Sequence, residues 1–430
     1  MNFGELNNYL NTKNCALLCG NGLSMNFDWD FANIMDRLFK AHKELLLKSK
    51  FTVKANRGYK EKMYLNYSNV IEYLRNIDEI GLYRIFEEGL KFGEKIYNDN
   101  DFIYELVRTK TFTELTFGMS EFTILGDLLR QWKKKGLRNI NIEYIPILVY
   151  FYYLAERYNK IEEYKLEYNT FIKVVRIGNS GSVRVAQKEG EKDWKNEILE
   201  NILFNGFNNY YRMLFCTAIF NNGKAIDIQK LSRIDEIDIE KLKCFLYQFK
   251  EILTLNYDRI LDNILERNLI HLHGEFVVGQ KEWCNYQSLS LEYEDKTISF
   301  SDILIGDYIY NKVSRAIIHS LAANFQDNKK CGTIPKNIEN IISSKKIDTL
   351  ITFGLNIDND QHILRNIITG FKWAGIEKPM IIYSYFTKED KQSFERTFNS
   401  VLTFSEELND YARSIEIKFI DARERMQMNY

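Results

Sequence analysis

The chain has 430 residues, 45% of them hydrophobic, and its 58 lysines and arginines nearly balance its 59 aspartates and glutamates. This composition excludes a wholly disordered protein, because the apolar residues suffice for one large domain or for two to three smaller units. The balanced charge excludes a general field that attracts polyanions, so we expect no nucleic-acid partner. We see no signal segment and no apolar run of transmembrane length, and the six cysteines are scattered, so we expect a cytoplasmic protein with no membrane partner.

The chain begins with the pattern of a strand, a glycine-rich turn and a helix. After a short predicted helix over 2–11, the apolar run Cys15–Cys19 is typical of a buried strand, and it ends at Gly20. Apolar side chains then recur at helical spacing from Phe31 to about Lys48. This order is typical of the start of a nucleotide-binding α/β fold.

Further short apolar runs in the second half of the chain predict the remaining strands. They are Ile252–Leu255, Leu269–Leu272, Thr349–Phe353, Met380–Tyr383 and Ile415–Ile420. Most of these runs are separated by helix-like stretches, which favours parallel pairing through crossover connections. We therefore expect an α/β fold with a Rossmann-like, mostly parallel six-stranded sheet and helices on both faces.

A large insertion is predicted to interrupt this fold. Residues 51–249 are rich in Tyr, Phe, Leu and Lys and mostly helical in period, except for two β-branched runs around a Gly-Asn-Ser-Gly turn, which predict a β-hairpin near 171–187. The simplest organisation is a discontinuous α/β domain formed by 1–50 and 250–430, with 51–249 as a mainly helical insertion.

Several polar or glycine-containing motifs follow the predicted strands. Gly20, Asn256, His273 and Gly354 each fall where such a strand ends. Parallel sheets bind ligands at the carboxyl ends of their strands. We therefore expect these four residues to share one rim.

The first motif is Gly20-Asn21-Gly22-Leu23-Ser24. Glycines without a β-carbon could let backbone N–H groups approach a pyrophosphate, and Ser24 would add a hydroxyl donor. The alternative is an ordinary turn between a strand and a helix, since the pattern is not G-x-G-x-x-G.

Asn256 and Asp258 follow the second predicted strand directly. Both residue types cap helices, and Asp258 suits that role because a helix-like stretch begins at Arg259. Asn256 is harder to explain by capping. An uncharged amide at the last strand position can hold a sugar hydroxyl or a water molecule.

Two of the five histidines, His271 and His273, lie in one short run. On a strand their side chains would share a face, with Leu272 on the other. A hydrogen-bonded core histidine is the favoured interpretation for His271, whereas His273 beside Gly274 has room for a ligand and can exchange a proton near neutral pH. Structural zinc is disfavoured, because further ligands at suitable spacing are lacking.

The last motif, Gly354-Leu-Asn356-Ile-Asp358-Asn-Asp360, follows another strand and opens a helix. Helix capping accounts for one of its acids but not for the whole cluster. The loop length and terminal glutamate of an EF-hand are missing, so a calcium loop of that kind is excluded.

Taken together, these motifs resemble the sirtuin-like superfamily, and more closely the zinc-less sirtuin-like NAD hydrolases of bacterial anti-phage defence. The matching elements are Gly20 to Ser24, Thr254 to Asp258, His273-Gly274, and Phe353 to Asn356 with Asp360. The similarity covers about 1–40 and 250–430. Two departures are Asn356, where the family often has serine, and the absence of the deacylase zinc ribbon from 275–345.

The resemblance implies hydrolysis of NAD⁺ to nicotinamide and ADP-ribose, with no zinc or other metal. It assigns Asn256 to orienting water and the ribose, and His273 to acting as a base or contacting a ribose hydroxyl. The residues that it assigns to binding NAD are Gly20, Asn21, Gly22, Ser24, Asp258, Gly354, Asn356 and Asp360.

An active NAD hydrolase would endanger its own cell. We therefore expect an NAD-depleting effector of abortive infection, kept at rest by homo-oligomerisation, by the helical insertion or by the need for a phage-encoded or defence-system activator. Two alternatives stay open at the level of sequence. One is a non-catalytic NAD or nucleotide sensor that signals through 51–249, and the other is an ADP-ribosyltransferase.

Overall fold

The computed structural model describes residues 1–48, 50–55, 60–112, 114–116, 119–179, 198, 201–202, 204–231, 234–279, 289–300, 334–357, 360–401 and 406–423. The chain divides into two compact units. The first unit comprises Met1–Ala32, Asn222–Glu275 and Lys330–Tyr430, and the second comprises Asn33–Asn221 and Phe276–Lys329. Across the described ranges, no helix has both the length and the apolar character needed to cross a lipid bilayer.

The first unit is an α/β unit built on a six-stranded sheet in which every neighbouring pair is parallel. The strand order is β12-β11-β10-β1-β5-β6. The bounds are β1 Cys15–Cys19, β5 Glu251–Thr254, β6 Ile270–His271, β10 Thr349–Phe353, β11 Met380–Tyr385 and β12 Glu416–Asp421. The six predicted strands are confirmed. The chain extends the sheet from β1 through β5 and β6, then returns to the other side of β1 with β10, which is the order of a doubly wound Rossmann-like sheet.

Helices flank this sheet. Their bounds are α1 Phe3–Thr12, α2 Asn21–Ser24, α13 Ile239–Leu246, α14 Ile260–Leu265, α16 Ile334–Lys345, α17 Gln361–Trp373, α18 Lys388–Val401 and α19 Glu406–Arg413, with 3₁₀ turns at Ile228–Lys230 and Ile234–Glu236. Ile382 of β11 packs in a buried cluster with Leu10 of α1 and Ile264 of α14. The next residue, Tyr383, stacks on Phe394 of α18. Because successive strand residues point to opposite faces, both faces of the sheet are covered.

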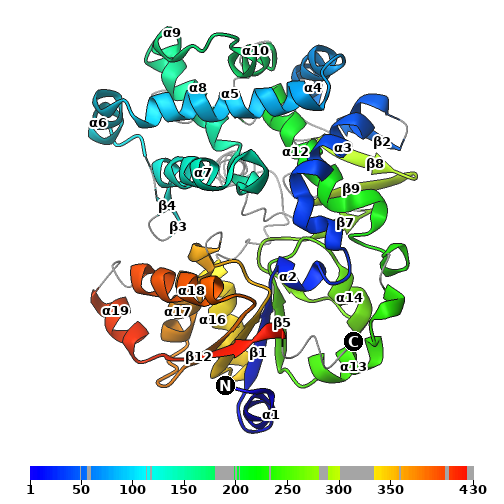
Figure 1. Ribbon diagram of the computed structural model, residues 1–430, viewed down its shortest axis with the longest axis vertical. Helices are drawn as coiled ribbons and strands as arrows, with labels where there is room; N and C mark the ends of the chain where they lie inside the picture. The colour runs from blue at the N-terminus through cyan, green and yellow to red at the C-terminus, as the bar shows by residue number, and fades with distance from the viewer. Residues whose placement is uncertain are drawn as a thin grey trace, which may run out of the picture. The chain divides into compact units, whose positions relative to one another are not determined.

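The second unit is mostly helical. The helices are α3 Ile34–Leu47, α4 Lys60–Leu74, α5 Glu79–Tyr97, α6 Asn100–Arg108, α7 Glu121–Lys135, α8 Ile147–Arg157, α9 Ile161–Tyr164, α10 Thr170–Ile177 and α12 Gly206–Phe220, labelled in Figure 1. Shorter 3₁₀ turns occupy Leu137–Asn139 and Ile142–Tyr144, and two more, Trp29–Asn33 and Asn221–Gly223, span the boundaries between the units. Helix α12 is buried along its whole length and packs against α3 and α4. It forms the centre of this unit.

Two small antiparallel sheets complete the second unit. The larger has the order β2-β8-β9-β7, with β2 Phe51–Ala55, β7 Phe276–Val278, β8 Leu289–Tyr293 and β9 Lys296–Phe300. The smaller pairs β3 Glu114–Thr116 with β4 Met119–Ser120. The rings of Phe51, Phe220 and Tyr293 contact one another in edge-on and tilted arrangements and join the larger sheet to the end of α12.

The boundaries of the units lie elsewhere than at the predicted residues 50 and 250. Helix α3 belongs to the second unit because it packs on α12, and β7, β8 and β9 belong there because they pair in one sheet with β2. Residues 222–249 belong to the first unit, where α13 packs on α14.

The predicted β-hairpin near 171–187 is wrong over its first arm, which forms helix α10. Phe171, Ile172, Val174 and Val175 are buried, a spacing that places them on one side of a helix. Packing of this side against α5, α4 and α12 outweighs the modest preference of β-branched residues for strands. The second predicted arm, which follows Gly181, lies outside the described residues.

Candidate active site at the carboxyl ends of the strands

The predicted motifs gather along one edge of the six-stranded sheet. Strands β10, β1, β5 and β6 are consecutive neighbours and run parallel, so the turns that follow them meet at the carboxyl edge. Gly354, Gly20 and Asn256 begin or lie in three of these turns, and His273 lies two residues beyond β6. The expectation of a shared rim for these residues agrees with the sheet topology.

The turns after β1 and β10 are hydrogen-bonded to each other. The N–H of Gly20 donates to the carbonyl of Phe353 over 2.9 Å, and the N–H of Gly22 donates to the carbonyl of Gly354 over the same distance. Both amides are therefore used inside the protein. A pyrophosphate at this turn would need other donors, so the binding role of Gly20 and Gly22 stays a prediction.

Glycine is required here by close packing of the two backbones. A β-carbon on Gly20 would lie 2.5 Å from the Gly354 oxygen, and one on Gly22 would lie 2.7 Å from the Gly354 α-carbon. Gly354 itself has a φ of +67°, and a β-carbon there would lie 2.6 Å from the nitrogen of Leu23. These distances are shorter than real β-carbon contacts, so the three glycines fix how the two turns meet.

A directed chain of hydrogen bonds links the turn after β1 to the turn after β5. The Asn256 side-chain amide donates to the Gly20 carbonyl over 3.2 Å and to the Ser24 hydroxyl over 2.7 Å. Ser24 in turn donates to Asp258 Oδ2 over 2.8 Å. All three side chains are buried. The Ser24 proton is committed to Asp258, so this hydroxyl accepts from Asn256 and donates to a carboxylate.

These bonds fix the orientation of the Asn256 amide. A carbonyl such as that of Gly20 only accepts hydrogen bonds, so the atom of Asn256 that faces it must be Nδ2. The other atom, Oδ1, is buried and has no hydrogen-bond partner among the described residues. Asn256 is only 2% exposed. A buried acceptor left without a donor costs about 1–3 kcal/mol, which makes Oδ1 a ready acceptor for a bound hydroxyl or water molecule.

Asp258 ends the hydrogen-bond chain and supports the next helix. Burial raises the pKa of its carboxyl group, while hydrogen bonds from Ser24 and from the Ile260 N–H, together with the charge of His271, partly offset that rise. Its Oδ1 accepts from the Ile260 N–H at the start of α14 over 3.1 Å. The N-cap position of α14 is Arg259 rather than the predicted Asp258, which instead accepts from the first helical N–H and from Ser24.

His273 lies beyond the end of β6 rather than within it. Because β6 ends at His271, the strand alternation that would place both imidazoles on one face does not extend to His273. The His273 side chain is buried, and its ring centroid lies 6.5 Å from that of Tyr257. Gly274 follows with a φ of +95°, a conformation that favours glycine.

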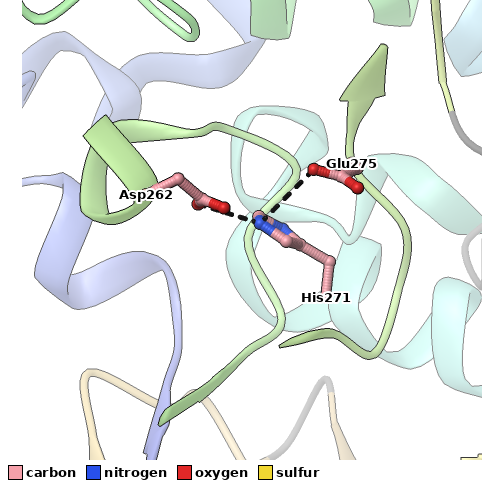
Figure 2. Close-up of side chains that lie close together, drawn as sticks. All are labelled: Asp262, His271 and Glu275. Carbon is pink, nitrogen blue, oxygen red and sulfur yellow. Dashed lines mark hydrogen bonds and ion pairs between the residues drawn. The ribbon is translucent and has the colours of Figure 1, made fainter. Parts of the chain in front are cut away.

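His271 is hydrogen-bonded through both ring nitrogens, as the core interpretation predicted. Its Nδ1 lies 2.7 Å from the backbone oxygen of Asn256, and its Nε2 lies 3.0 Å from Asp262 Oδ2. Figure 2 shows the imidazole between the carboxylates of Asp262 and Glu275, and the Glu275 oxygen is 3.8 Å from Nε2. The side chains of His271 and Asp262 are each 3% exposed.

The pKa values of this pair move apart. Burial alone would raise the pKa of Asp262, but the hydrogen bond and charge of His271, the Leu269 N–H and Arg259 outweigh it and leave this pKa below its ordinary value. Burial alone would lower the pKa of His271, but the hydrogen bond and charge of Asp262, aided by Glu275, raise it. Both shifts favour the charged forms of the two side chains.

Asp262, His271 and Glu275 are also close enough to be considered as metal ligands, since their ligand atoms lie within 4.8 Å of one another. The charge of the carboxylates is already compensated. Arg259 lies 3.6 Å from Asp262 and 3.4 Å from Glu275, and the His271 ring faces Asp262 at hydrogen-bonding distance. We assign no metal to this cluster.

Three other residues predicted to bind NAD lie after β1 or β10. They make no described contact with the Asn256 side chain. Asn21 and Asn356 are exposed, and Asp360 precedes α17 with its N–H bonded to the Asn356 carbonyl. Asp262, Glu275 and Arg259 were missed by sequence reasoning. The one available signal for Asp262 was its position on the following helix, four residues after Asp258.

Comparison of the chain with protein-family models, with curated proteins and with solved structures gives no significant match. The resemblance to sirtuin-like NAD hydrolases therefore stays a prediction from the motifs themselves. The arrangement of side chains at the carboxyl edge of the sheet is the observation that bears on function.

Proposed function

We propose that this protein hydrolyses NAD⁺ to nicotinamide and ADP-ribose at the rim formed by the turns after β1, β5 and β6. The observation that carries the proposal is the unpartnered Oδ1 of Asn256. It is a buried acceptor of fixed orientation at the carboxyl end of a central parallel strand, which is where doubly wound folds bind nucleotides.

The proposed chemistry needs such an acceptor. Breaking the bond between the ribose C1′ and the nicotinamide nitrogen develops positive charge on the sugar, and a water molecule must then attack C1′. Oδ1 of Asn256 would accept a hydrogen bond from that water or from a ribose hydroxyl. The bonds from its Nδ2 to Gly20 and Ser24 hold the amide in place beforehand, which lowers the cost of ordering the reactants.

His273 is the proposed base or ribose-hydroxyl contact. Its imidazole is buried near Tyr257, one strand away from Asn256 in the order of the sheet. Histidine suits this role because its ordinary pKa of about 6.5 lets it take up a proton near neutral pH. The proposed binding surface adds Asn21, Asn356 and Asp360 from the turns after β1 and β10.

The cellular role that we propose is an NAD-depleting effector of anti-phage defence in the cytoplasm. Uncontrolled NAD⁺ cleavage would harm the cell that makes the enzyme. We therefore propose that a resting state is maintained by homo-oligomerisation or by the second unit, and that a phage-encoded or defence-system protein releases it.

Mass spectrometry of NAD⁺ incubated with the purified full-length protein tests the proposal, with and without extract of infected cells. We expect equal amounts of nicotinamide and ADP-ribose from the wild type and a loss of at least about 100-fold in Asn256→Ala, because a positioned polar group is removed from the reaction centre. Asn263→Ala is the matched control. Asn263 also donates a side-chain hydrogen bond to a backbone carbonyl, that of Ile226, and makes no described contact with the Asn256 side chain.

Three outcomes contradict hydrolysis at this rim. Calorimetric binding of NAD⁺ without any product indicates a nucleotide sensor. Nicotinamide release with the ADP-ribose label retained on protein indicates ADP-ribosyl transfer. Undiminished turnover in a folded variant that combines Asn256→Ala with His273→Ala places the reaction elsewhere on the molecule.

A further inference from the structure

Both ring nitrogens of His271 face hydrogen-bond acceptors. Nδ1 lies 2.7 Å from the Asn256 backbone oxygen, and a backbone carbonyl can only accept. Nε2 lies 3.0 Å from Oδ2 of Asp262. A neutral imidazole carries one N–H, so it can satisfy only one of these two contacts when the carboxylate is ionised.

Two groups besides His271 also favour the ionised form of Asp262. Its Oδ1 accepts a hydrogen bond from the Leu269 N–H over 2.9 Å, and the Arg259 guanidinium lies 3.6 Å from the same oxygen. A backbone donor and a cation on one oxygen favour the charged form. The geometry therefore favours a His271 that carries a proton on each nitrogen.

The other charged groups around the ring also favour the imidazolium. Glu275, just after β6, brings an oxygen within 3.8 Å of Nε2. Asp258, in the turn between β5 and α14, interacts with His271 through its charge. Arg259 opposes them, but it lies 3.4 Å from Glu275 and faces the carboxylates. Three acids and one guanidinium thus surround the ring, which favours a positive charge on it.

The imidazolium holds the residue that carries the unpartnered acceptor. The Asn256 N–H donates to Thr254 Oγ1 over 3.0 Å, and its C=O accepts from His271, so both backbone groups of Asn256 are fixed. A neutral His271 would keep its single proton between Nε2 and the charged Asp262, because hydrogen bonds to a charged partner are about twice as strong as neutral ones. Nδ1 would then present a lone pair to the Asn256 oxygen and repel it.

We propose that His271 is a positioning residue whose imidazolium holds the Asn256 backbone and thereby aims Asn256 Oδ1, so that activity is lost when the ring gives up a proton at alkaline pH. This inference rests on the proposed function, since it assigns a regulator to the same site. It also makes a claim about the protonation of His271 that can be measured without any substrate.

The first measurement is deuterium exchange at the imidazole C2 position of His271, followed by mass spectrometry across pH 5 to 10. We expect the midpoint of His271 to lie above about 6.5, the value of an unperturbed histidine, and to fall in Asp262→Asn. A midpoint at or below that of an unperturbed histidine overturns the inference. The result does not depend on whether NAD⁺ is cleaved.

The second measurement is NAD⁺ turnover against pH for the wild type and two variants. In His271→Ala we expect kcat to fall about 10–100-fold with KM within about 2-fold, because supporting residues of this kind act through geometry rather than through substrate contact. In Asp262→Asn the new amide can donate to Nε2, so a neutral ring keeps its Nδ1 proton on the Asn256 carbonyl. Turnover of this variant should persist at alkaline pH where wild-type turnover declines.

His42→Gln is the control for loss of a buried histidine, because His42 lies in the second unit and has no part in the proposed site. An unchanged kcat in His271→Ala, or the wild-type alkaline decline in Asp262→Asn, overturns the positioning role while leaving NAD⁺ hydrolysis intact. A wild-type protein that does not cleave NAD⁺ overturns the proposed function. The protonation of His271 is then decided by deuterium exchange alone.

Discussion

His42 in the second unit and His271 in the first are both buried histidines with a hydrogen bond to each ring nitrogen. His42 Nε2 lies 3.0 Å from the Ile77 carbonyl, and its Nδ1 lies 2.7 Å from the Tyr210 hydroxyl. A hydroxyl can donate, so a neutral ring satisfies both contacts. Burial, with a smaller contribution from Lys43, leaves the pKa of His42 below its ordinary value despite the Ile77 contact.

The contrast with His271 shows that burial alone does not decide the charge of a histidine. The His271 side chain is 3% exposed and His42 as a whole residue 1% exposed, so both rings are shielded from solvent. Their second partners differ: a hydroxyl in one case and a carboxylate in the other. The ability of that partner to donate determines whether the ring holds one proton or two.

The largest expected effect on stability comes from removing the Asp262 carboxylate, the partner that His42 lacks. Asp262→Ala removes the nearest carboxylate from the buried His271 ring and the acceptor of the Leu269 N–H, so we expect a loss of about 3–5 kcal/mol in the free energy of unfolding at pH 6. Urea denaturation followed by circular dichroism measures it. A loss below about 1 kcal/mol would show that His271 is not charged in the folded protein.

A smaller effect is expected at the neutral histidine. Tyr210→Phe removes the only described donor to His42 Nδ1 and leaves that nitrogen buried without a partner, which should cost about 1–3 kcal/mol. The same denaturation experiment applies. A larger loss of stability in this variant than in Asp262→Ala would contradict the comparison. Leaving a neutral acceptor without a partner should cost less than removing the partner of a charge.

The smallest effects should appear in the pH dependence of stability, with opposite signs at the two histidines. The pKa of His271 is raised in the folded protein. Its contribution to the free energy of unfolding is therefore fully present below about pH 6.5 and is lost as the pH rises through the pKa of the folded state. The pKa of His42 is lowered in the folded protein. Its contribution to the free energy of unfolding is therefore present above about pH 6.5 and is lost as the pH falls through the pKa of the folded state.

Substitution separates these two contributions. Thermal melting of wild type, His271→Gln and His42→Gln across pH 5 to 9 should show that the first variant removes part of the alkaline decline in stability and the second removes part of the acid decline. Parallel curves for all three proteins would mean that neither histidine changes its pKa on folding.

The strands of the first unit were the most predictable part of the fold. Cys15–Cys19 and Thr349–Phe353 are short apolar runs bounded by polar residues or glycine, and they form β1 and β10 with those bounds. A strand buried on both faces is apolar along most of its length, so its ends are visible in the sequence. Helix α10 was missed because its β-branched residues resemble a strand until the packing of its neighbours is known.

The rim was predictable as a place but not as a set of contacts. Parallel order alone brings Gly20, Asn256 and Gly354 to one edge of the sheet. The sequence could not show that the two glycine turns bond to each other, or that Ser24 donates to Asp258 and leaves Asn256 Oδ1 without a donor. Which polar atom stays unpaired depends on side-chain geometry between distant segments.

The central place of β1 has a consequence for how the chain folds during synthesis. Both neighbours of β1 come much later in the chain, β5 at residue 251 and β10 at residue 349. While the ribosome makes residues 20–250, the apolar strand Cys15–Cys19 has no partner in its sheet, whereas much of the second unit has already emerged. At about 5–20 residues per second this interval lasts on the order of 10–50 seconds, during which the unpaired apolar strand is open to aggregation.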